Sequence, residues 1–275
     1  MRRVFLALVV ACGVTSDLGA ASAISVSWTP PGIYRNEIAE TLTPAAEVLA
    51  GRAAFPDDRS DGAVLLNETV YFRGNDQLLY RVRHLIQYVR EQSAVQRVAS
   101  VVIRFDRERE SAFLAQANSI TLDGRIQPIE RSAAFIQTPQ RAADESSYTS
   151  QAELNVVFPN VGVGTATEVI VVVRENTPVM PRAFACVHPF GEYWPVFRQR
   201  IVFDLPKNEW AGMQMHVDPG VPEAVTAKEV RGRIRKTWTA DKLPRFRYEE
   251  NAPALPFCAP TLWLTTIPDW NAIAR

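Results

Sequence analysis

The residues with the clearest potential for chemistry are Cys186 and His188, which a single valine separates. Alternate residues of a β-strand point to the same face, so a strand here would set a thiol near an imidazole, as in cysteine nucleophiles. An activated cysteine also needs a helix N-terminus or a cation that lowers its pKa, and an orienting carboxylate. Neither lies nearby in the sequence, and Pro189 follows at the predicted strand end. We therefore predict no catalytic residue, and expect Cys186 to pack in the core or to form a disulfide.

The other polar motifs lack the spacing that metal or cofactor binding requires. The three histidines, His84, His188 and His216, are far apart and have no H-x-x-x-H or C-x-x-C companion, which argues against a zinc site. Gly162 and Gly164 precede a predicted strand rather than a helix, so they do not form a dinucleotide fingerprint. Pairs of adjacent carboxylates fall in predicted loops and do not suggest a glycosidase. The sequence predicts no metal and no cofactor.

The first residues have the features of a signal peptide. Met1-Arg2-Arg3 is a positive n-region, Val4–Val14 is an apolar stretch shorter than the ~20 residues that span a bilayer, and Ala21-Ser22-Ala23 is an A-x-A cleavage site. The mature chain would begin at Ile24 and be periplasmic or secreted. A lipoprotein signal, with acylation of Cys12, is the alternative. No later segment is apolar for long enough to cross a membrane.

Export changes how the remaining cysteines are interpreted. If Cys12 leaves with the signal peptide, Cys186 and Cys258 form an even pair in an oxidising compartment. A disulfide between them would close a long loop and contribute ~4 kcal/mol in the chain-entropy model. The alternative is that they pack separately as small apolar residues. The sequence leaves both open.

Composition bounds the class of protein. The 275 residues are 47% apolar with a formal net charge of +0 and a pI near 6.9. A chain of this length removes ~70–75% of its unfolded surface from water, so folding requires neither a metal nor a disulfide. Nucleic-acid binders concentrate Lys and Arg on one face, and the balanced charge gives no sign of such a surface. We expect a globular protein without a nucleic-acid partner.

Alternation of apolar and polar residues predicts a β-rich fold. The segment 80–88 places His84 on an apolar face, where it would be a hydrogen-bonded core histidine, and places Arg81 and Arg83 on the opposite face. The run Val169–Val173 has no polar alternation, which places it centrally in a sheet. The predicted strands are 64–72, 80–88, 98–105, 113–122, 126–130, 152–158, 168–174, 182–187, 196–205 and 230–239.

The segment 36–54 carries apolar residues at helical spacing, and Thr43-Pro44 would start a helix there. The strands that follow are short and separated by turn residues such as Asp123-Gly124 and Pro219-Gly220, as in antiparallel folds. We therefore predict an all-β fold: an antiparallel two-layer β-sandwich with a short N-terminal helical lead and a C-terminal helix start.

Aromatic residues form a candidate interaction surface. Phe190, Tyr193, Trp194 and Phe197 lie close together around two prolines. Exposed rings of this kind can anchor a partner or stack on a sugar. The alternative is that they cover the core or a sheet edge.

A family resemblance joins these elements. The segments that carry it, in order, are Gly62–Thr69, Arg81–Gln87, Ala117–Gly124, Tyr148-Thr149-Ser150, Phe158–Val173, Pro189-Phe190, Pro195–Arg200 and Thr237–Pro244. Together they resemble the DUF3857 domain, a β-rich module that typically precedes a transglutaminase-like domain in exported bacterial proteins. Together with the signal peptide predicted at 1–23, the resemblance divides the chain into a lead segment at 24–60, a DUF3857-like sandwich at 61–248 and a C-terminal connector at 249–275.

The end of the chain, Pro260–Arg275, resembles the connector into the transglutaminase-like domain. The catalytic Cys-His-Asp unit of that domain is absent from these residues. The leading hypothesis is a non-catalytic exported module that acts as a scaffold or recognition domain for a transglutaminase-like or cell-envelope partner. Two alternatives remain: the N-terminal part of a truncated transglutaminase or cysteine-protease-like enzyme, and a carbohydrate-binding module that uses Trp194.

Overall fold

The structure is a computed structural model that describes residues 25–55, 58–139, 150–178, 180, 183–226, 229, 231–247 and 253–267. The predicted signal peptide, Cys12 and the predicted C-terminal helix start lie outside these residues. The predictions for these segments therefore stay predictions.

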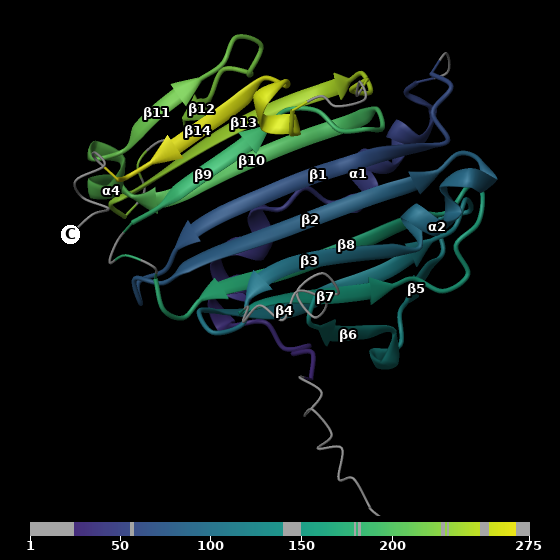
Figure 1. Ribbon diagram of the computed structural model, residues 1–275, viewed down its shortest axis with the longest axis horizontal. Coiled ribbons are helices and arrows are strands. Elements are labelled where there is room, and N and C mark those ends of the chain that lie inside the picture. The colour runs from purple at the N-terminus through teal and green to yellow at the C-terminus, as the bar shows by residue number, and fades with distance from the viewer. Residues whose placement is uncertain are drawn as a thin grey trace, which may run out of the picture.

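Strands form most of the described chain (Figure 1). They are β1 (Gly62–Arg73), β2 (Leu79–Val89), β3 (Ser100–Asp106), β4 (Glu110–Ile120), β5 (Ile126–Pro128), β6 (Ala134–Gln137), β7 (Gln151–Val157), β8 (Ala166–Glu175), β9 (Ala185–Pro189), β10 (Val196–Pro206), β11 (Gln214–Val217), β12 (Val225–Thr226), β13 (Arg233–Leu243) and β14 (Thr261–Thr265). The helical turns are η1 (Tyr34–Ile38), η2 (Ala39–Thr41), α1 (Ala45–Leu49), η3 (Ala50–Ala53), η4 (Gln92–Ala94), α2 (Val95–Val98), η5 (Arg131–Ala133), α4 (Lys207–Ala211) and η6 (Leu255–Phe257).

The strands build one large sheet and two small ones. The main sheet has eight strands in the order β12-β13-β10-β1-β2-β8-β4-β5, and the small sheets are β3-β7-β6 and β11-β14-β9. The named strands pair antiparallel except for β1 and β10, which run parallel in the middle of the main sheet.

Both small sheets cover the same face of the main sheet, which we call the front face. Phe203, Tyr71, Arg81 and Val173 are successive register partners across β10, β1, β2 and β8, so their side chains point to one face. Phe203 packs in a cluster with sheet β11-β14-β9, and Val173 packs in a cluster with sheet β3-β7-β6. The second layer of the sandwich is therefore split in two. The predicted all-β, two-layer sandwich is confirmed.

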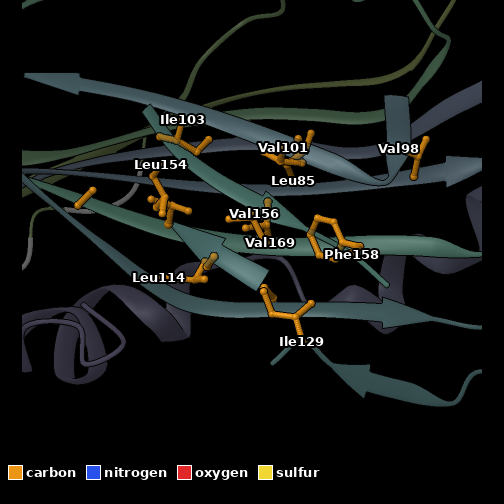
Figure 2. Packing of buried hydrophobic residues seen from close by; sticks show 14 of the residues in the cluster. Leu85, Val98, Val101, Ile103, Leu114, Ile129, Leu154, Val156, Phe158 and Val169 are labelled. Atoms are coloured by element: carbon orange, nitrogen blue, oxygen red, sulfur yellow. The ribbon is translucent and has the colours of Figure 1, made fainter. Parts of the chain in front are cut away.

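The larger core lies between β3, β7 and the main sheet (Figure 2). Val101 and Ile103 of β3 and Leu154 of β7 meet Leu114 of β4 and Val169 of β8. Burial of each such side chain stabilises the fold by about 1.5–3 kcal/mol. The apolar run of β8 is buried and pairs with strands on both sides, as its sequence predicted.

The N-terminal lead covers the opposite face, which we call the back face; α1 passes behind β1 and β2 in Figure 1. Its predicted helical content is confirmed as short turns. Ile38 packs against Val82 and Val172, and Val48 packs against Ile86; neither Ile38 nor Val48 is exposed. Truncation of such a side chain to alanine typically costs about 2–5 kcal/mol. The lead is thus an integral layer of the fold.

The predicted domain boundaries at 60/61 and 248/249 stay predictions. β14, which falls in the predicted connector, pairs with β9 and β11 and supplies Leu262 and Leu264 to the core. The first strand of the connector is therefore part of the sandwich.

A charged cluster is buried between the back face and the lead. His84 of β2 lies between Glu68 of β1 and Glu168 of β8, at 3.5 Å from Glu68 (Nδ1 to Oε2) and 3.0 Å from Glu168 (Nε2 to Oε1). Arg200 forms an ion pair with Glu68. The backbone N–H and the hydroxyl of Thr43 each donate to Glu68 over 3.0 Å. The prediction of a hydrogen-bonded core histidine at position 84 is confirmed, and the cluster joins the lead to the sheet.

The cluster fixes the charges of its members. Burial alone lowers the pKa of His84, but the hydrogen bond to Glu168 and the charges of both carboxylates outweigh it and raise that pKa. Burial alone raises the pKa values of Glu68 and Glu168, whereas their bonds to His84 and to neighbouring donors bring both below the ordinary value. Two carboxylates therefore share two cations, His84 and Arg200, in the interior.

Candidate functional site

The split in the second layer leaves a cavity of about 560 Å³ on the front face. Strand β3 forms one wall and the end of β9 forms the other, while β1 and β2 form most of the floor. In Figure 1 the floor strands β1 and β2 run between β9 and β3. The site is thus a consequence of the two small sheets stopping short of each other.

Period-two alternation of β1 and β2 aims polar side chains into this cavity. Asn67, Thr69 and Tyr71 of β1 and Arg81 and Arg83 of β2 all line it. Register pairs Thr69 with Arg83 and Tyr71 with Arg81, so the two arginines lie side by side with β1 residues. The sequence correctly placed Arg81 and Arg83 on the face opposite His84, but it did not predict a cavity above them.

Arg83 stands out among the arginines of the cavity. Arg81 lies 3.9 Å from Glu110, and Arg104 of β3 forms an ion pair with Glu153 at 3.0 Å. Arg83 makes neither a hydrogen bond nor an ion pair with the residues that the structure describes, and Glu192 acts on it through charge alone. Burial lowers the pKa of Arg83, but an arginine at neutral pH remains a cation. The cavity therefore presents a guanidinium that has no hydrogen-bonded partner among the described residues.

Glu192 is the acidic member of the cavity. Asn67 donates a hydrogen bond from Nδ2 to its Oε1 over 2.8 Å. Burial raises the pKa of Glu192, and the charge of Arg83 and the bond from Asn67 only partly offset this effect. Arg81 and Arg104 have carboxylate partners in Glu110 and Glu153, so Glu192 is the carboxylate of the cavity lining that acts on Arg83.

His188 closes the other wall of the cavity. Its Nε2 lies 3.2 Å from Nε2 of Gln199, whose amide also donates to the Pro189 carbonyl over 2.7 Å. The Gln199 Oε1 accepts a hydrogen bond from the backbone N–H of Gly191 over 3.0 Å, which fixes the amide orientation. Burial, together with the charge of Arg83, lowers the pKa of His188 to about 4. His188 is therefore a neutral acceptor that orients Gln199.

Cys186 lies on the same side of β9 as His188, as alternation predicted. The thiol is 5% exposed and belongs to the core cluster that also contains Phe184 and Leu264. Burial, opposed by Tyr71 and Arg81, raises the pKa of Cys186 to about 11. The cysteine is thus a protonated thiol, and His188 bonds to Gln199 instead.

The structure does not form the candidate disulfide. Cys186 and Cys258 are both free, the first buried and the second exposed. The thiol of Cys258 faces carbonyl oxygens of its own turn, of which the Pro253 oxygen is 3.4 Å away. The physical reason is that Cys186 points into the core between the layers, whereas Cys258 lies outside it. This arrangement matches the alternative in which the two residues are placed separately.

The four aromatic residues of the candidate surface do not form one patch. Phe190 and Trp194 are buried, and Tyr193 is 63% exposed. Trp194 donates from Nε1 to Asp61 over 2.8 Å, and Phe197 packs on the back face against Gly51. Phe197 of β10 therefore packs on the back face, whereas Phe190 and Trp194 precede β10 and pack in the front-face clusters. Three of the four cover the core.

Two smaller cavities extend the central one along β2. One, of about 230 Å³, shares Arg81 and Arg104 with it, and the other, of about 360 Å³, shares Arg83 and Glu192. Along β2 the floor reads Arg81, Arg83, Leu85 and then Gln87. We call the three cavities together the groove. It follows β2 for about 20 Å, at 3.3 Å per residue.

Within the described ranges, no cluster of three metal-ligating side chains is present, and no helix is long and apolar enough to span a membrane. The groove therefore offers hydrogen bonds, one open cation and an extended shape. These are features of a binding site.

The fold and the groove define the class: a two-layer β-sandwich with a divided second layer and an arginine-lined groove. The model of DUF3857, described as a domain of unknown function with a solved structure, matches residues 75–247, which is well over half of the chain. The chain belongs to this family, and the resemblance found in the sequence is confirmed. No curated protein matches the sequence.

Among solved structures, the fold is similar to the crystal structure of a putative protease from Parabacteroides distasonis ATCC 8503, with a TM-score of 0.69 and 17% identity. The match covers 78% of this chain and 42% of that one, so this chain spans less than half of that protein. At this identity the likeness shows the fold alone. An M1 zinc metallopeptidase mutant from Deinococcus radiodurans matches with a TM-score of 0.36 and 11% identity over 74% of this chain and 41% of that one, which is too low to inform the fold.

Proposed function

We propose that this protein is a non-catalytic, exported recognition module, which binds an anionic segment of a transglutaminase-like or cell-envelope partner in the groove. The observation that carries this proposal is Arg83, a cation in a cavity floor with no ion pair to any described residue. A guanidinium that is partly removed from water favours an incoming carboxylate or phosphate, because a charge-assisted hydrogen bond replaces lost hydration.

The chemistry of the strand β9 supports a binding role over a catalytic one. A cysteine nucleophile acts as the thiolate, and a thiol with a pKa of about 11 is almost entirely protonated at neutral pH. A histidine with a pKa of about 4 is a weak base, and His188 already contacts Gln199. Export is supported by the signal-peptide features of residues 1–23.

A second candidate is that the chain is the N-terminal part of a longer transglutaminase or protease-like enzyme. The structural match to part of a putative protease favours it, since this fold covers 42% of that protein. In such an enzyme the groove would receive a segment of the substrate. Sequencing the gene beyond the codon for Arg275 tests this candidate, because a Cys-His-Asp region there would support it and its absence would count against it.

The burial of Trp194 counts against the carbohydrate-binding alternative. Trp194 is 8% exposed, its indole N–H bonds Asp61, and the Arg97 guanidinium lies 4.9 Å from the centre of its ring. A buried ring in these contacts does not offer a stacking platform for a neutral sugar.

Titration with two anionic polymers, poly-L-glutamate and oligogalacturonate, tests the proposal. We expect at least one to bind, and Arg83→Gln to weaken binding about tenfold or more, the typical effect of losing a charge-assisted hydrogen bond. The control is Arg131→Gln, an exposed arginine outside the groove. If Arg83→Gln and Arg131→Gln bound these polymers with equal affinity, the groove would not be the binding site.

Catalysis is tested separately. The purified protein is incubated with casein, and both peptide release and amine incorporation are measured. We expect neither reaction above a buffer blank. Turnover that disappears in Cys186→Ser would overturn the non-catalytic assignment.

A further inference from the structure

The wall of the groove formed by β3 has an open strand edge. β3 is an outer strand of its sheet, with β7 as its only strand partner within the described residues. The ends of the ladder fix its hydrogen-bond phase, because the Phe158 N–H donates to the Ala99 oxygen and the Arg107 N–H donates to the Ser150 oxygen. In an antiparallel ladder, bonded and non-bonded pairs alternate. Val101, Ile103 and Phe105 therefore face β7 with their backbone groups.

The intervening residues point their backbone groups the other way. Val102 and Arg104 direct N–H and C=O toward the free edge, and both residues line the central cavity. No hydrogen bond within the described part of the chain engages these groups. Asp106, the next residue in this phase, is occupied, since its N–H donates to Glu110 over 2.8 Å. Two consecutive pairing positions of β3 are therefore open to the groove.

The opposite wall is blocked in the way that natural sheets protect their edges. β9 bonds β14 through Cys186 and His188, which leaves Val187 and Pro189 facing the free edge. Pro189 has no N–H, and its carbonyl accepts from Gln199. Only the β3 side can continue a ladder at the cavity.

The side chains on the floor of the groove indicate which ligand side chains would fit there. Successive inward positions of β2 are the cation Arg83 and the apolar Leu85, and beside Leu85 the groove is lined by Val64 and Trp194. A strand laid over this floor would point alternate side chains down, about 6.6 Å apart. An acidic side chain over Arg83 would thus place its neighbour two positions away over an apolar surface.

Resting on the recognition function proposed above, we propose that the groove binds an extended peptide segment as an added strand on β3. The segment hydrogen-bonds the backbone of Val102 and Arg104. It directs an acidic side chain to Arg83 and an apolar side chain, two positions away, to Leu85. The groove is long enough for about six extended residues.

The experiment selects peptides from a random phage-displayed library on the full mature protein. We expect enriched sequences to share an acidic residue two positions from an apolar one, without an intervening proline. The enriched peptide is then synthesised and its affinity measured by fluorescence anisotropy. Arg83→Gln should weaken binding about tenfold or more, and Arg131→Gln should leave it unchanged.

Val102→Pro separates strand addition from side-chain recognition. It removes an N–H that points to the groove and leaves the bonds to β7, because edge strands tolerate proline in this phase. We expect it to weaken the peptide at least about fivefold, the value of one hydrogen bond. Val102→Thr keeps the N–H and the branched shape and should bind normally. Hydrogen exchange gives a second readout, since the amides of Val102 and Arg104 should become protected only when the peptide is bound.

The outcomes distinguish this inference from the function on which it rests. Peptide binding that needs Arg83 but is unaffected by Val102→Pro, without amide protection, overturns strand addition and keeps the recognition role. Oligogalacturonate that binds through Arg83 while no peptide is enriched overturns the peptide class alone. If neither probe distinguishes Arg83→Gln from Arg131→Gln, both proposals fall.

Discussion

Replacing His84 with leucine tests the energetics of the buried charge cluster. Glu68 is 0% exposed and Glu168 is 3% exposed, and His84 is the cation between them. Leucine leaves Glu168 with only the neutral donors Gln116 and Asn118. Breaking a buried pair by removing one partner costs about 3–5 kcal/mol. Since domains are stable by about 5–15 kcal/mol, the variant should lose a large part of its stability.

The loss should depend on pH in a defined way. The pKa of His84 is raised in the fold, so its contribution is complete below its ordinary value of 6.5 and is lost as pH rises through the raised pKa. The pKa values of Glu68 and Glu168 are lowered, so their contributions are complete above 4.5 and are lost as pH falls through the lowered values. The difference between wild type and His84→Leu should therefore be largest between these two limits and shrink on either side.

Urea unfolding followed by tryptophan fluorescence measures this difference across pH. A loss of about 3–5 kcal/mol corresponds to a fall of about 6–20 °C in Tm for a chain of this size. His216→Leu is the control, because that histidine is exposed and should change stability by no more than about 0.5 kcal/mol. Adding Glu168→Gln to His84→Leu should restore part of the loss. A loss below about 1 kcal/mol, or one that is equal at every pH, would refute the reasoning.

Three further predictions concern packing, thiols and export. Gly51→Ala should destabilise the protein by about 1–3 kcal/mol in urea unfolding, because the new Cβ would overlap the ring of Phe197. Gly162→Ala is the control, since a Cβ there would have nothing within 4 Å, and equal effects of the two substitutions would contradict the packing. In the native mature protein a thiol reagent should modify Cys258 and reach Cys186 only after denaturation, and finding no free thiol in either state would establish a disulfide instead. A β-lactamase fused behind residues 1–30 should protect cells from ampicillin, and sensitivity of those cells would count against the signal peptide.

The sequence predicted the long strands that are buried on at least one face. β2 shows alternation of apolar and polar residues, and β8 shows an uninterrupted apolar run, because one face of β2 and both faces of β8 are covered. β6, β11 and β12 were missed because they are short and largely exposed, and the burial that produces alternation is absent.

The groove could not be predicted from the sequence, for a different reason. Arg81 and Arg83 were correctly placed on one face, but a solvated face and a groove floor have the same alternation in sequence. The distinction depends on where two other sheets end. The sequence did carry a signal for the buried charge cluster, because Glu68 and Glu168 interrupt or flank apolar runs. That these two carboxylates meet His84, however, depends on the register of three strands.

The parallel pairing of β1 with β10 sets the order in which this molecule can assemble. β1 leaves the ribosome early, yet its neighbour is synthesised only after all the strands from β2 to β9. Contacts so remote along the chain are slow to form, and until then a long hydrophobic edge stays open to other chains. The half of the chain made first must therefore keep this edge from pairing with other chains until β10 has been added.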